Sequence, residues 1–460
     1  MLMDIRFSPH NTHLESPDAF SSRDPHLARL SKLPMAHASS LLDDLPFGTP
    51  GIYTLGGGRQ VGKTTLTKQW ISHLLKKKVP PEAIRYLSGE LIDDHHSLVR
   101  HLTDIFDGAP LYNVLHYLIL DEVTYIKDWD KGIKYVADAG LFEQTAILLT
   151  GSDIAFISDA RMRFPGRRGP ADQVDFHLYP LCFRETVLLK GLLPPEALSE
   201  LNQPNCQPSG PVITTLFNAF QSYLIHGGFL TAINDIAAHN RILPSTFAIY
   251  SDWIRGDMIK KGKKEHYLRE LLDAVIRHTG SQISWNALAQ SLSIDHPQTV
   301  SDYAALLVSM DALFIQQALV EDKLAGAPKK ARKLMFTDPF IHHAIYNWLN
   351  PTSDPYRRIT DALSASAPLA SAIAEAVSVS HYRRRFPTYY IKAKGEVDIA
   401  YIHRNRFWPI EVKWTNQLRP GDLKQIVKYP NARILTRNKL PGAIQGIPTA
   451  PLPLALFQLT

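Results

Sequence analysis

The stretch Gly57-Gly58-Arg59-Gln60-Val61-Gly62-Lys63-Thr64-Thr65 decides the fold of the first part of this chain. It fits the pattern G-x-x-x-x-G-K-[ST], whose glycines let backbone N–H groups curl around a phosphate. An apolar run at 51–55 predicts a strand before it, and an amphipathic run at 65–75 predicts a helix after it. We therefore expect residues 57–65 to bind a nucleotide, with Lys63 acting on the β- and γ-phosphates and Thr64 offering its hydroxyl to Mg²⁺.

A second motif, Leu118-Ile119-Leu120-Asp121-Glu122, is an apolar run that ends in two carboxylates. Such a run predicts a buried parallel strand, and ligands of open α/β sheets bind at the carboxyl ends of the strands. Asp121 is expected to hold Mg²⁺ through water, and Glu122 to orient or activate the attacking water. A strand that meets a solvated acidic turn is the alternative interpretation.

A third apolar strand is expected at 146–150 and is followed by Gly151-Ser152-Asp153. We favour Ser152 as the polar residue that touches the γ-phosphate or the water, although a helix cap explains it equally well. The basic run 161–168 comes next. Arg167 is the candidate arginine for neutralising transition-state charge, in its own subunit or a neighbour's, and a solvated basic loop is the alternative.

Composition limits the classes of protein to which the chain can belong. Its 460 residues predict two to four domains, and the net charge of +6 permits a nucleic-acid partner without requiring one. No apolar run, including 111–120, is long enough to span a bilayer, so no membrane partner is expected. Two cysteines give neither a disulfide framework nor a cysteine metal site, and they fit a cytoplasmic protein. The histidines lack ligand spacing and are interpreted as surface or core residues.

The expected fold class is α/β: a P-loop NTPase parallel sheet, then a helical and winged-helix region, then a small α/β nuclease-like domain. The predicted domains are an N-terminal arm (1–50), the ATPase core (51–190), a helical region (212–278), a winged helix-turn-helix (279–337) and the last domain (338–460). The winged helix rests on a helix capped by Ser284, a helix at 298–310, strands at 313–320 and 333–336, and basic residues at 329–332 between them. Such a unit binds DNA phosphates or packs against protein, and both interpretations stay open.

The last domain carries a second chemical pattern. Asp398 and Glu411 begin and end a predicted hairpin, and Lys413 shares the face of Glu411 by the period of two. Asp398 and Glu411 are expected to share a divalent cation, with Lys413 beside the scissile phosphate and Glu375, on a preceding helix, as a third carboxylate. Solvated hairpin charges, or a nuclease-like fold without cleavage activity, are the alternatives.

Together these motifs resemble a family of bacterial and archaeal AAA-superfamily P-loop ATPases with a C-terminal restriction-endonuclease-like domain of unknown function. The matching stretches are Arg23-Asp24-Pro25, 58–65, 120–122, Trp129, 150–152, 166–167, 179–185, 226–229, 337–338, 396–398 and 410–413. Two positions depart from the family: Cys182 replaces its usual serine, and Val397 stands where the nuclease motif prefers proline. The resemblance implies ATP and Mg²⁺ as cofactors, and it leaves the cellular task undefined.

Three functions therefore compete. The first is a Mg²⁺-dependent ATPase that couples its nucleotide state to engagement of double-stranded DNA by its C-terminal half. The second is a slow nucleotide switch or scaffold with an inactive nuclease-like domain that binds a protein partner. The third is an ATP-gated, metal-dependent DNA nuclease. A small-molecule kinase is a weaker option, and an oligomer is compatible with all of them.

Overall fold

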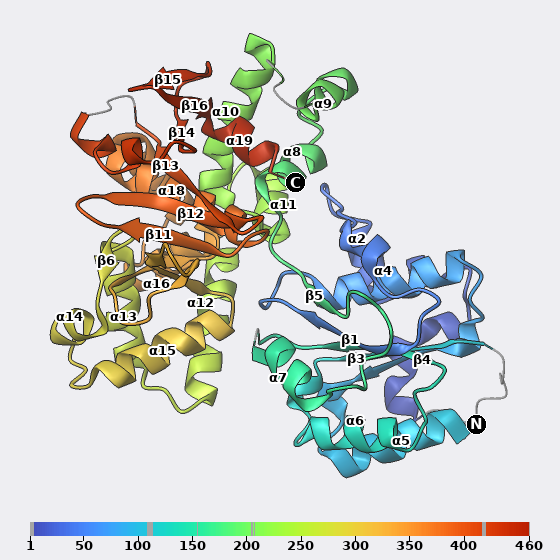
Figure 1. The fold of residues 1–460 in the computed structure, drawn as a ribbon. Coiled ribbons are helices and arrows are strands. Elements are labelled where there is room, and N and C mark those ends of the chain that lie inside the picture. The colour runs from blue at the N-terminus through green and yellow to red at the C-terminus, as the bar shows by residue number, and fades with distance from the viewer. Residues whose placement is uncertain are drawn as a thin grey trace. The chain divides into compact units, whose positions relative to one another are not determined.

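The computed structural model describes residues 4–107, 114–153, 155–203, 206, 208–415 and 420–459. Residues 111–113 of the predicted apolar run 111–120 lie outside this part of the chain. The chain forms two compact units. The first comprises Met1–Tyr179 with Ser309–Asp311, and the second comprises Pro180–Val308 with Ala312–Thr460 (Figure 1).

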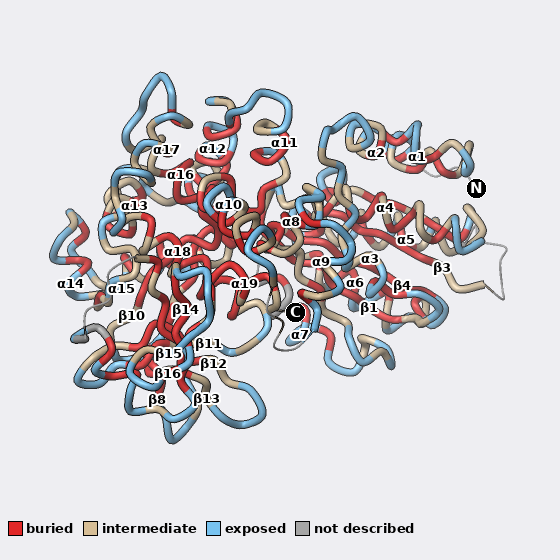
Figure 2. Tube along the Cα trace, turned by 90° about the horizontal axis from the view of Figure 1, so that it is seen from above, coloured by how far each residue is buried: buried red, intermediate tan, exposed pale blue. Residues whose placement is uncertain are grey.

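The first unit is built on a five-stranded sheet with the strand order β2-β3-β4-β1-β5. All neighbouring strands pair in parallel, as expected of strands that alternate with helices along the chain. The strands are β1 (Gly51–Gly56), β2 (Ile84–Ser88), β3 (His116–Asp121), β4 (Thr145–Thr150) and β5 (Asp175–His177). Every residue of β1 and β4 is buried, so these strands form the middle of the core (Figure 2).

Helices cover both faces of this sheet. The helix α4 (Lys63–Lys76) packs through Trp70 against residues such as Tyr53, whereas the neighbouring Ile52 belongs to the core cluster of the opposite face. That cluster includes side chains of α5 (His95–Asp107), α6 (Trp129–Asp138) and α7 (Ala155–Arg163). Short 3₁₀ turns complete the connections at η3 (Pro81–Ala83), η4 (Gly89–Leu91) and η5 (Val123–Tyr125).

The segment before β1, predicted as an arm, is part of this unit. It forms η1 (Ile5–His10), η2 (Thr12–Leu14), α1 (Phe20–Arg23), α2 (Pro25–Leu30) and α3 (Leu41–Asp44). Asn11 exchanges two hydrogen bonds with the backbone of Tyr86, and His13 bonds to the carbonyl of Ile84 at 3.1 Å. Because β2 is the edge strand, these side chains satisfy backbone groups that the sheet leaves unpaired.

The second unit begins with helices. They are α8 (Phe183–Leu189), α9 (Pro195–Leu201), α10 (Gly210–His226), α11 (Leu230–His239), α12 (Pro244–Lys260) and α13 (Glu265–Arg277). Cys182 caps α8 in a reciprocal capping box with Glu185, so the thiol takes the place in which a serine hydroxyl is favoured. A helical region is therefore present where the sequence predicts one.

A three-stranded antiparallel sheet with the order β6-β10-β7 follows. Its region contains β6 (Gln282–Ile283), α14 (Trp285–Gln290), α15 (Pro297–Ser309), β7 (Leu313–Gln317) and β10 (Arg332–Phe336). Ser284 accepts a hydrogen bond from the backbone of Ala287, which confirms the predicted cap. The predicted wing also contains a small hairpin, β8 (Leu319–Val320) with β9 (Ala325–Gly326). The identity of this region as a winged helix stays a prediction.

A six-stranded mixed sheet with the order β11-β12-β13-β14-β16-β15 forms the last part. Its strands are β11 (Thr388–Lys392), β12 (Glu396–His403), β13 (Arg406–Lys413), β14 (Arg433–Thr436), β15 (Gly442–Ile444) and β16 (Ile447–Pro451). The remaining elements are α16 (Pro339–Leu349), α17 (Pro355–Ala365), α18 (Ala367–Arg383), η6 (Pro420–Leu423), η7 (Ile426–Lys428) and α19 (Leu452–Phe457). The predicted hairpin is confirmed, because β12 and β13 pair antiparallel with Ile399 opposite Ile410.

Among the described residues, no single helix is both long enough and apolar enough to cross a bilayer. The helices α17 and α18 reach that length and hydropathy only when taken together, across a bend of 101°.

Buried neutral histidines are expected to make the second unit less stable in acid, and His381 on α18 shows why. Its Nε2 accepts a hydrogen bond from the backbone of Phe183 at 2.9 Å, and its Nδ1 lies 2.8 Å from the carbonyl of Val377. The neutral imidazole therefore accepts a hydrogen bond at Nε2 and can donate one at Nδ1. Burial, helped by the nearby Arg384, lowers the pKa of His381 to about 3.

We expect His381→Gln to flatten the acid limb of the stability curve. Below about pH 6.5 the unfolded chain takes up a proton that the folded chain refuses, so His381 lowers stability by about 1.4 kcal/mol per pH unit as the pH falls. Denaturant unfolding at pH 7 and pH 5 measures this slope, and the exposed His239→Gln is the control. An unchanged slope in His381→Gln would contradict the assignment.

Candidate functional site

The glycine-rich loop has the backbone shape that its sequence predicts. Gln60 and Gly62 have positive φ angles of 62° and 102°, and Gly57 has a φ of 148°. A Cβ on Gly57 would lie 2.4 Å from the carbonyl oxygen of Leu178, so a larger residue does not fit there. Gly62 directly precedes α4 and has no side chain to cap it, which leaves the first-turn N–H groups directed toward the loop.

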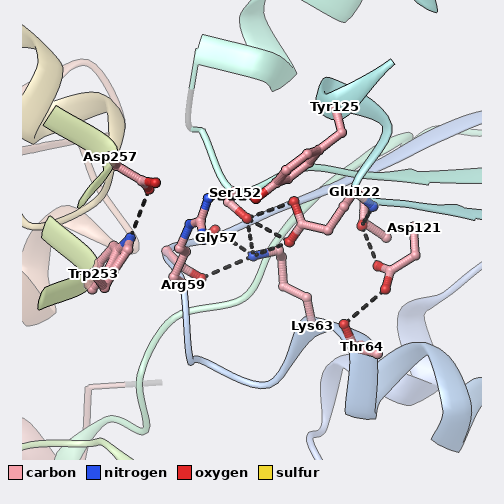
Figure 3. Close-up of polar contacts among 12 residues, drawn as sticks. Gly57, Arg59, Lys63, Thr64, Asp121, Glu122, Tyr125, Ser152, Trp253 and Asp257 are labelled. Atoms are coloured by element: carbon pink, nitrogen blue, oxygen red, sulfur yellow. Dashed lines mark hydrogen bonds and ion pairs between the residues drawn. The ribbon is translucent and has the colours of Figure 1, made fainter. Parts of the chain in front are cut away.

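Lys63 extends back over this loop (Figure 3). Its Nζ donates to the carbonyl oxygens of Gly57 and Gly58 at 3.0 and 3.1 Å and to Ser152 Oγ at 3.2 Å, and it lies 3.6 Å from Glu122 Oε1. Only 5% of the Lys63 side chain is exposed. Burial lowers its pKa, although the carboxylate of Glu122 opposes the shift. The Lys63 ammonium is therefore buried and fixed beside the loop.

Asp121, at the end of β3, lies at the centre of a set of short hydrogen bonds. Thr64 Oγ1 donates to its Oδ2 at 2.9 Å, Tyr86 donates to the same oxygen at 2.5 Å, and Thr150 Oγ1 donates to Oδ1 at 2.5 Å. Burial and the neighbouring Asp121 raise the pKa of Tyr86 well above its ordinary value, so this hydroxyl keeps its proton and donates. The predicted pair of magnesium ligands, Thr64 and Asp121, is thus already in contact.

Glu122 follows in a left-handed conformation with φ 54° and ψ 46°. Such a backbone is uncommon for glutamate and typical of functional turns. Its carboxylate oxygens lie 2.6 and 2.8 Å from Ser152 Oγ, and its backbone N–H donates to Thr150 Oγ1 at 2.8 Å. Gly89 allows the close approach, since a Cβ there would lie 2.5 Å from the carbonyl oxygen of Glu122. The structure therefore brings Lys63, Glu122 and Ser152 together.

Arg167 is not brought to this cluster. Its Nε donates to Asp138, the last residue of α6, at 2.5 Å. The carbonyl of the adjacent Arg168 abuts Gly51, the first residue of β1, whereas the phosphate loop follows the last residue of that strand. Six residues of strand span about 20 Å, so Arg167 lies near the start of β1, at the end of the strand opposite the phosphate loop. Its catalytic role stays a prediction.

Sequence reasoning missed Tyr86 and Lys68. Tyr86 lies on β2, and Lys68 lies one turn beyond the loop on α4, with its Nζ 3.4 Å above the Tyr86 ring. The position of Lys68 on the buried face of an amphipathic helix is a signal that the sequence did offer. Tyr86 offered none, because its role depends on the pairing of β2 beside β3.

The second set of predicted site residues gathers in the other unit. Asp398 on β12 accepts a hydrogen bond from the backbone of Val412, and Lys413 lies 2.7 Å from Glu411 Oε1. Burial, then Asp398, raises the pKa of Glu411 and raises that of Glu375 to about 7. Of the predicted set, Glu375 and Asp398 come together, with ligand oxygens within 4.8 Å of each other, whereas Glu411 lies outside that group of described residues. Their role in holding a metal stays a prediction.

This cluster contains two residues that the sequence did not single out as part of it. Glu396 joins the carboxylates, and Lys333 Nζ lies 2.7 Å from Glu375 Oε1. As the side chains stand, a metal does not fit among these carboxylates, because the lysine ammonium occupies the space between them.

Comparisons with known proteins agree with the geometry of the first site. Residues 49–187 match the family described as AAA domain, and residues 218–352 match a domain of unknown function (DUF8612). The chain thus contains an AAA-type P-loop ATPase domain, a class that binds and hydrolyses nucleotides.

The relatives have no described activity. An uncharacterized protein of Haemophilus influenzae is 22% identical over 270 residues, which is 56% of this chain and 60% of that protein. One of Methanocaldococcus jannaschii is 31% identical over 150 residues, which is 32% of this chain and 29% of that protein. The chain therefore spans less than two thirds of the length of either relative.

Solved structures also resemble this fold. A Walker-type ATPase of Pyrococcus abyssi gives a TM-score of 0.35 at 13% identity, covering 66% of this chain and 92% of its own. The Orc1 protein of Aeropyrum pernix in complex with DNA gives 0.30 at 12% identity, covering 75% and 97%. Likeness at this level carries no conclusion about function or partners.

Proposed function

We propose that the AAA-type ATPase domain binds and hydrolyses ATP with Mg²⁺, and that its nucleotide state controls engagement of DNA by the C-terminal half. The observation that carries the ATPase proposal is the single hydrogen-bonded network that joins Lys63, Ser152 and Glu122, with Thr64 and Asp121 paired beside it. Phosphoryl transfer needs a cation for the phosphates, oxygen ligands for Mg²⁺ and a carboxylate that orients water, and these residues offer all three.

The donor set fits a magnesium nucleotide. Thr64 offers a hydroxyl and Asp121 a carboxylate, which are the oxygen ligands that Mg²⁺ prefers. The N–H groups of the loop and of the first turn of α4 are suited to phosphate oxygens. Bound Mg²⁺ would supply charge neutralisation for the β- and γ-phosphates.

The ion pair between Lys63 and Glu122 suggests how nucleotide binding prepares the site. Phosphate oxygens are stronger partners for the ammonium than a carboxylate 3.6 Å away. When Lys63 turns to the phosphates, Glu122 loses that partner and keeps Ser152, which holds its carboxylate in place. Glu122 then accepts a hydrogen bond from the attacking water and orients it.

Support for a DNA partner comes from exposed basic side chains in the C-terminal half. Lys329 and Lys330 are exposed beside β10, in the place of a wing, and Lys260, Lys261 and Lys264 are exposed around the turn between α12 and α13. Lysines of this kind bind phosphate oxygens without reading base sequence.

A second candidate is a slow nucleotide switch whose nuclease-like domain is inactive and binds a protein partner. The observation that favours it is Lys333, which fills the carboxylate cluster of the C-terminal unit. The third hypothesis is an ATP-gated nuclease, which requires Asp398 and Glu411 to hold a metal. Glu411→Ala separates the nuclease from the others, because it should abolish cleavage and leave ATP turnover unchanged.

The test of the proposed function is ATP hydrolysis by the purified chain with Mg²⁺, with and without double-stranded DNA. Lys63→Ala is expected to lower turnover about 10²-fold or more, because the phosphates lose their buried cation. Lys76→Ala, at the exposed end of the same helix, is the matched control and should behave like the wild type. Stimulation by DNA that Lys63→Ala abolishes supports DNA coupling, whereas slow turnover indifferent to DNA favours the switch. Equal activity in Lys63→Ala would contradict the ATPase proposal itself.

A further inference from the structure

The carboxylate cluster of the C-terminal unit already contains a cation. Lys333 has no exposed surface, and its Nζ lies 2.7 Å from Glu375 Oε1 and 3.7 Å from Asp398 Oδ1. It is also ion-paired with Glu396. Ligand oxygens of Glu375, Glu396 and Asp398 all lie within 4.8 Å of one another, a spacing that suits one shared cation.

Lys333 belongs to a row of three side chains, one from each strand of the three-stranded sheet. It lies opposite Gln282 of β6 and Gln316 of β7 in the strand register. Gln282 contacts the Glu396 carboxylate, and Gln316 Nε2 donates to the carbonyl of Asp398 at 2.8 Å and that of Tyr389 at 3.0 Å. Residues in one row across a sheet share a face, so this face is shaped to meet β11 and β12.

Lys333 is ion-paired with all three carboxylates, whereas the other lysine of the site, Lys413, is ion-paired with Glu411. Lys413 is paired with Glu411 at 2.7 Å, and Glu411 Oε2 is buried without a hydrogen-bond partner within the described residues. These carboxylates are at most 31% exposed, and carboxylates this close repel one another unless a cation lies between them. Either a metal or a lysine satisfies this requirement, and both do not fit at once.

We propose that Lys333 is the resident cation of the Glu375, Glu396 and Asp398 cluster, in place of a divalent metal. The cluster therefore joins the three-stranded sheet to the six-stranded sheet, and it binds Mg²⁺ or Mn²⁺ only when the charge of Lys333 is removed. This inference concerns the C-terminal unit alone and does not depend on the ATPase proposal.

The experiment is titration of the nucleotide-free chain with Mn²⁺, followed by calorimetry and by the EPR signal of free Mn²⁺. The wild type is expected to show no Mn²⁺ site that depends on Asp398. Lys333→Met nearly keeps the length of the side chain and removes its charge. It is expected to gain one such site, which binds Mn²⁺ at least about tenfold more tightly than the wild type does at these carboxylates. Adding Asp398→Asn to this variant should abolish the new site, and the exposed Lys330→Met is the matched control.

Thermal unfolding gives a second readout. Lys333→Met should unfold at a lower temperature than the wild type without metal and recover with Mn²⁺, while the wild type should not shift. A folded Lys333→Met that gains no site overturns the proposal. If this variant stays unfolded with and without Mn²⁺, the wild-type titration decides. Mn²⁺ binding by the wild type that Asp398→Asn removes overturns the proposal. A wild type without such binding supports Lys333 as the cation.

Discussion

Glu122→Gln is expected to reduce ATP turnover by about 10²- to 10⁴-fold while leaving ATP binding close to that of the wild type. The amide has the shape of the carboxylate and can still accept a hydrogen bond from Ser152, which lies 2.6 and 2.8 Å from the two carboxylate oxygens. It has no negative charge with which to orient or deprotonate water. Lys63 and Thr64, which are expected to hold the phosphates and Mg²⁺, are unchanged.

The measurement is phosphate release at saturating Mg²⁺ and ATP, together with the affinity for a fluorescent ATP analogue. Glu143→Gln, in an exposed loop before β4, is the matched control and should keep full activity. A parallel Asp121→Asn variant should instead raise the Mg²⁺ concentration needed for activity. If Glu122→Gln lost affinity and turnover equally, Glu122 would be a binding residue; if it kept full turnover, another group would position the water.

The backbone of the glycine-rich loop and its two flanking elements was predictable because these parts are local. The loop 57–65, the strand before it and the helix after it are contiguous, so each requires only local backbone geometry. The end of β3 at Asp121 was also predictable, since an apolar run that ends in two acids has few other readings. Ser152, just after β4, contacts Glu122 and Lys63 as a residue placed after this strand can, and its predicted contact with the γ-phosphate or the water stays a prediction.

Features that depend on pairing between distant segments were not predictable. Asn11 and His13 read as part of a polar arm, yet they satisfy the backbone of the edge strand β2. Tyr86 was not singled out, because its contact with Asp121 depends on the pairing of β2 beside β3. No local pattern records which strand becomes the edge, so the sequence did not reveal these roles.

Lys333 illustrates the same limit in the C-terminal unit. It begins an apolar strand directly after a basic loop, and this context suggested a wing that binds phosphates. The structure directs its side chain inward to carboxylates of α18 and β12, which follow 42 to 65 positions later in the chain. Two of these carboxylates, Glu375 and Asp398, were among the predicted site residues, and the third, Glu396, was not. Their partner Lys333 was not predicted, because it belongs to another sheet.

Lys68→Met is expected to destabilise the first unit by about 3–5 kcal/mol, the usual cost of leaving one partner of a buried ion pair alone. The side chains of Lys68 and Asp24 are 0% and 1% exposed, and Lys68 Nζ lies 3.7 Å from Asp24 Oδ2. The same ammonium donates to the carbonyl of His10 at 2.7 Å and lies over the ring of Tyr86. Methionine fills the space and satisfies none of these groups.

The ion pair joins the N-terminal segment to the proposed nucleotide site. Asp24 accepts hydrogen bonds from the backbone of His26 and Leu27 at the start of α2, so its charge is fixed in place by the segment before β1. Tyr86, under the Lys68 ammonium, donates to Asp121. Loss of Lys68 should therefore loosen α2 first, and through Tyr86 it should weaken the alignment of Asp121.

Denaturant unfolding of the full chain, followed by tryptophan fluorescence to which the buried Trp70 of α4 contributes, measures the loss. Lys76→Met, exposed on the same helix, is the control and should stay within about 0.5 kcal/mol of the wild type. Burial already lowers the pKa of Lys68 to about 8, so the charge is costly to bury and survives only because Asp24 compensates it. Asp24→Asn added to Lys68→Met should therefore recover part of the lost stability, since no charge is then left uncompensated. A double variant less stable than both single variants would show that the two residues act independently.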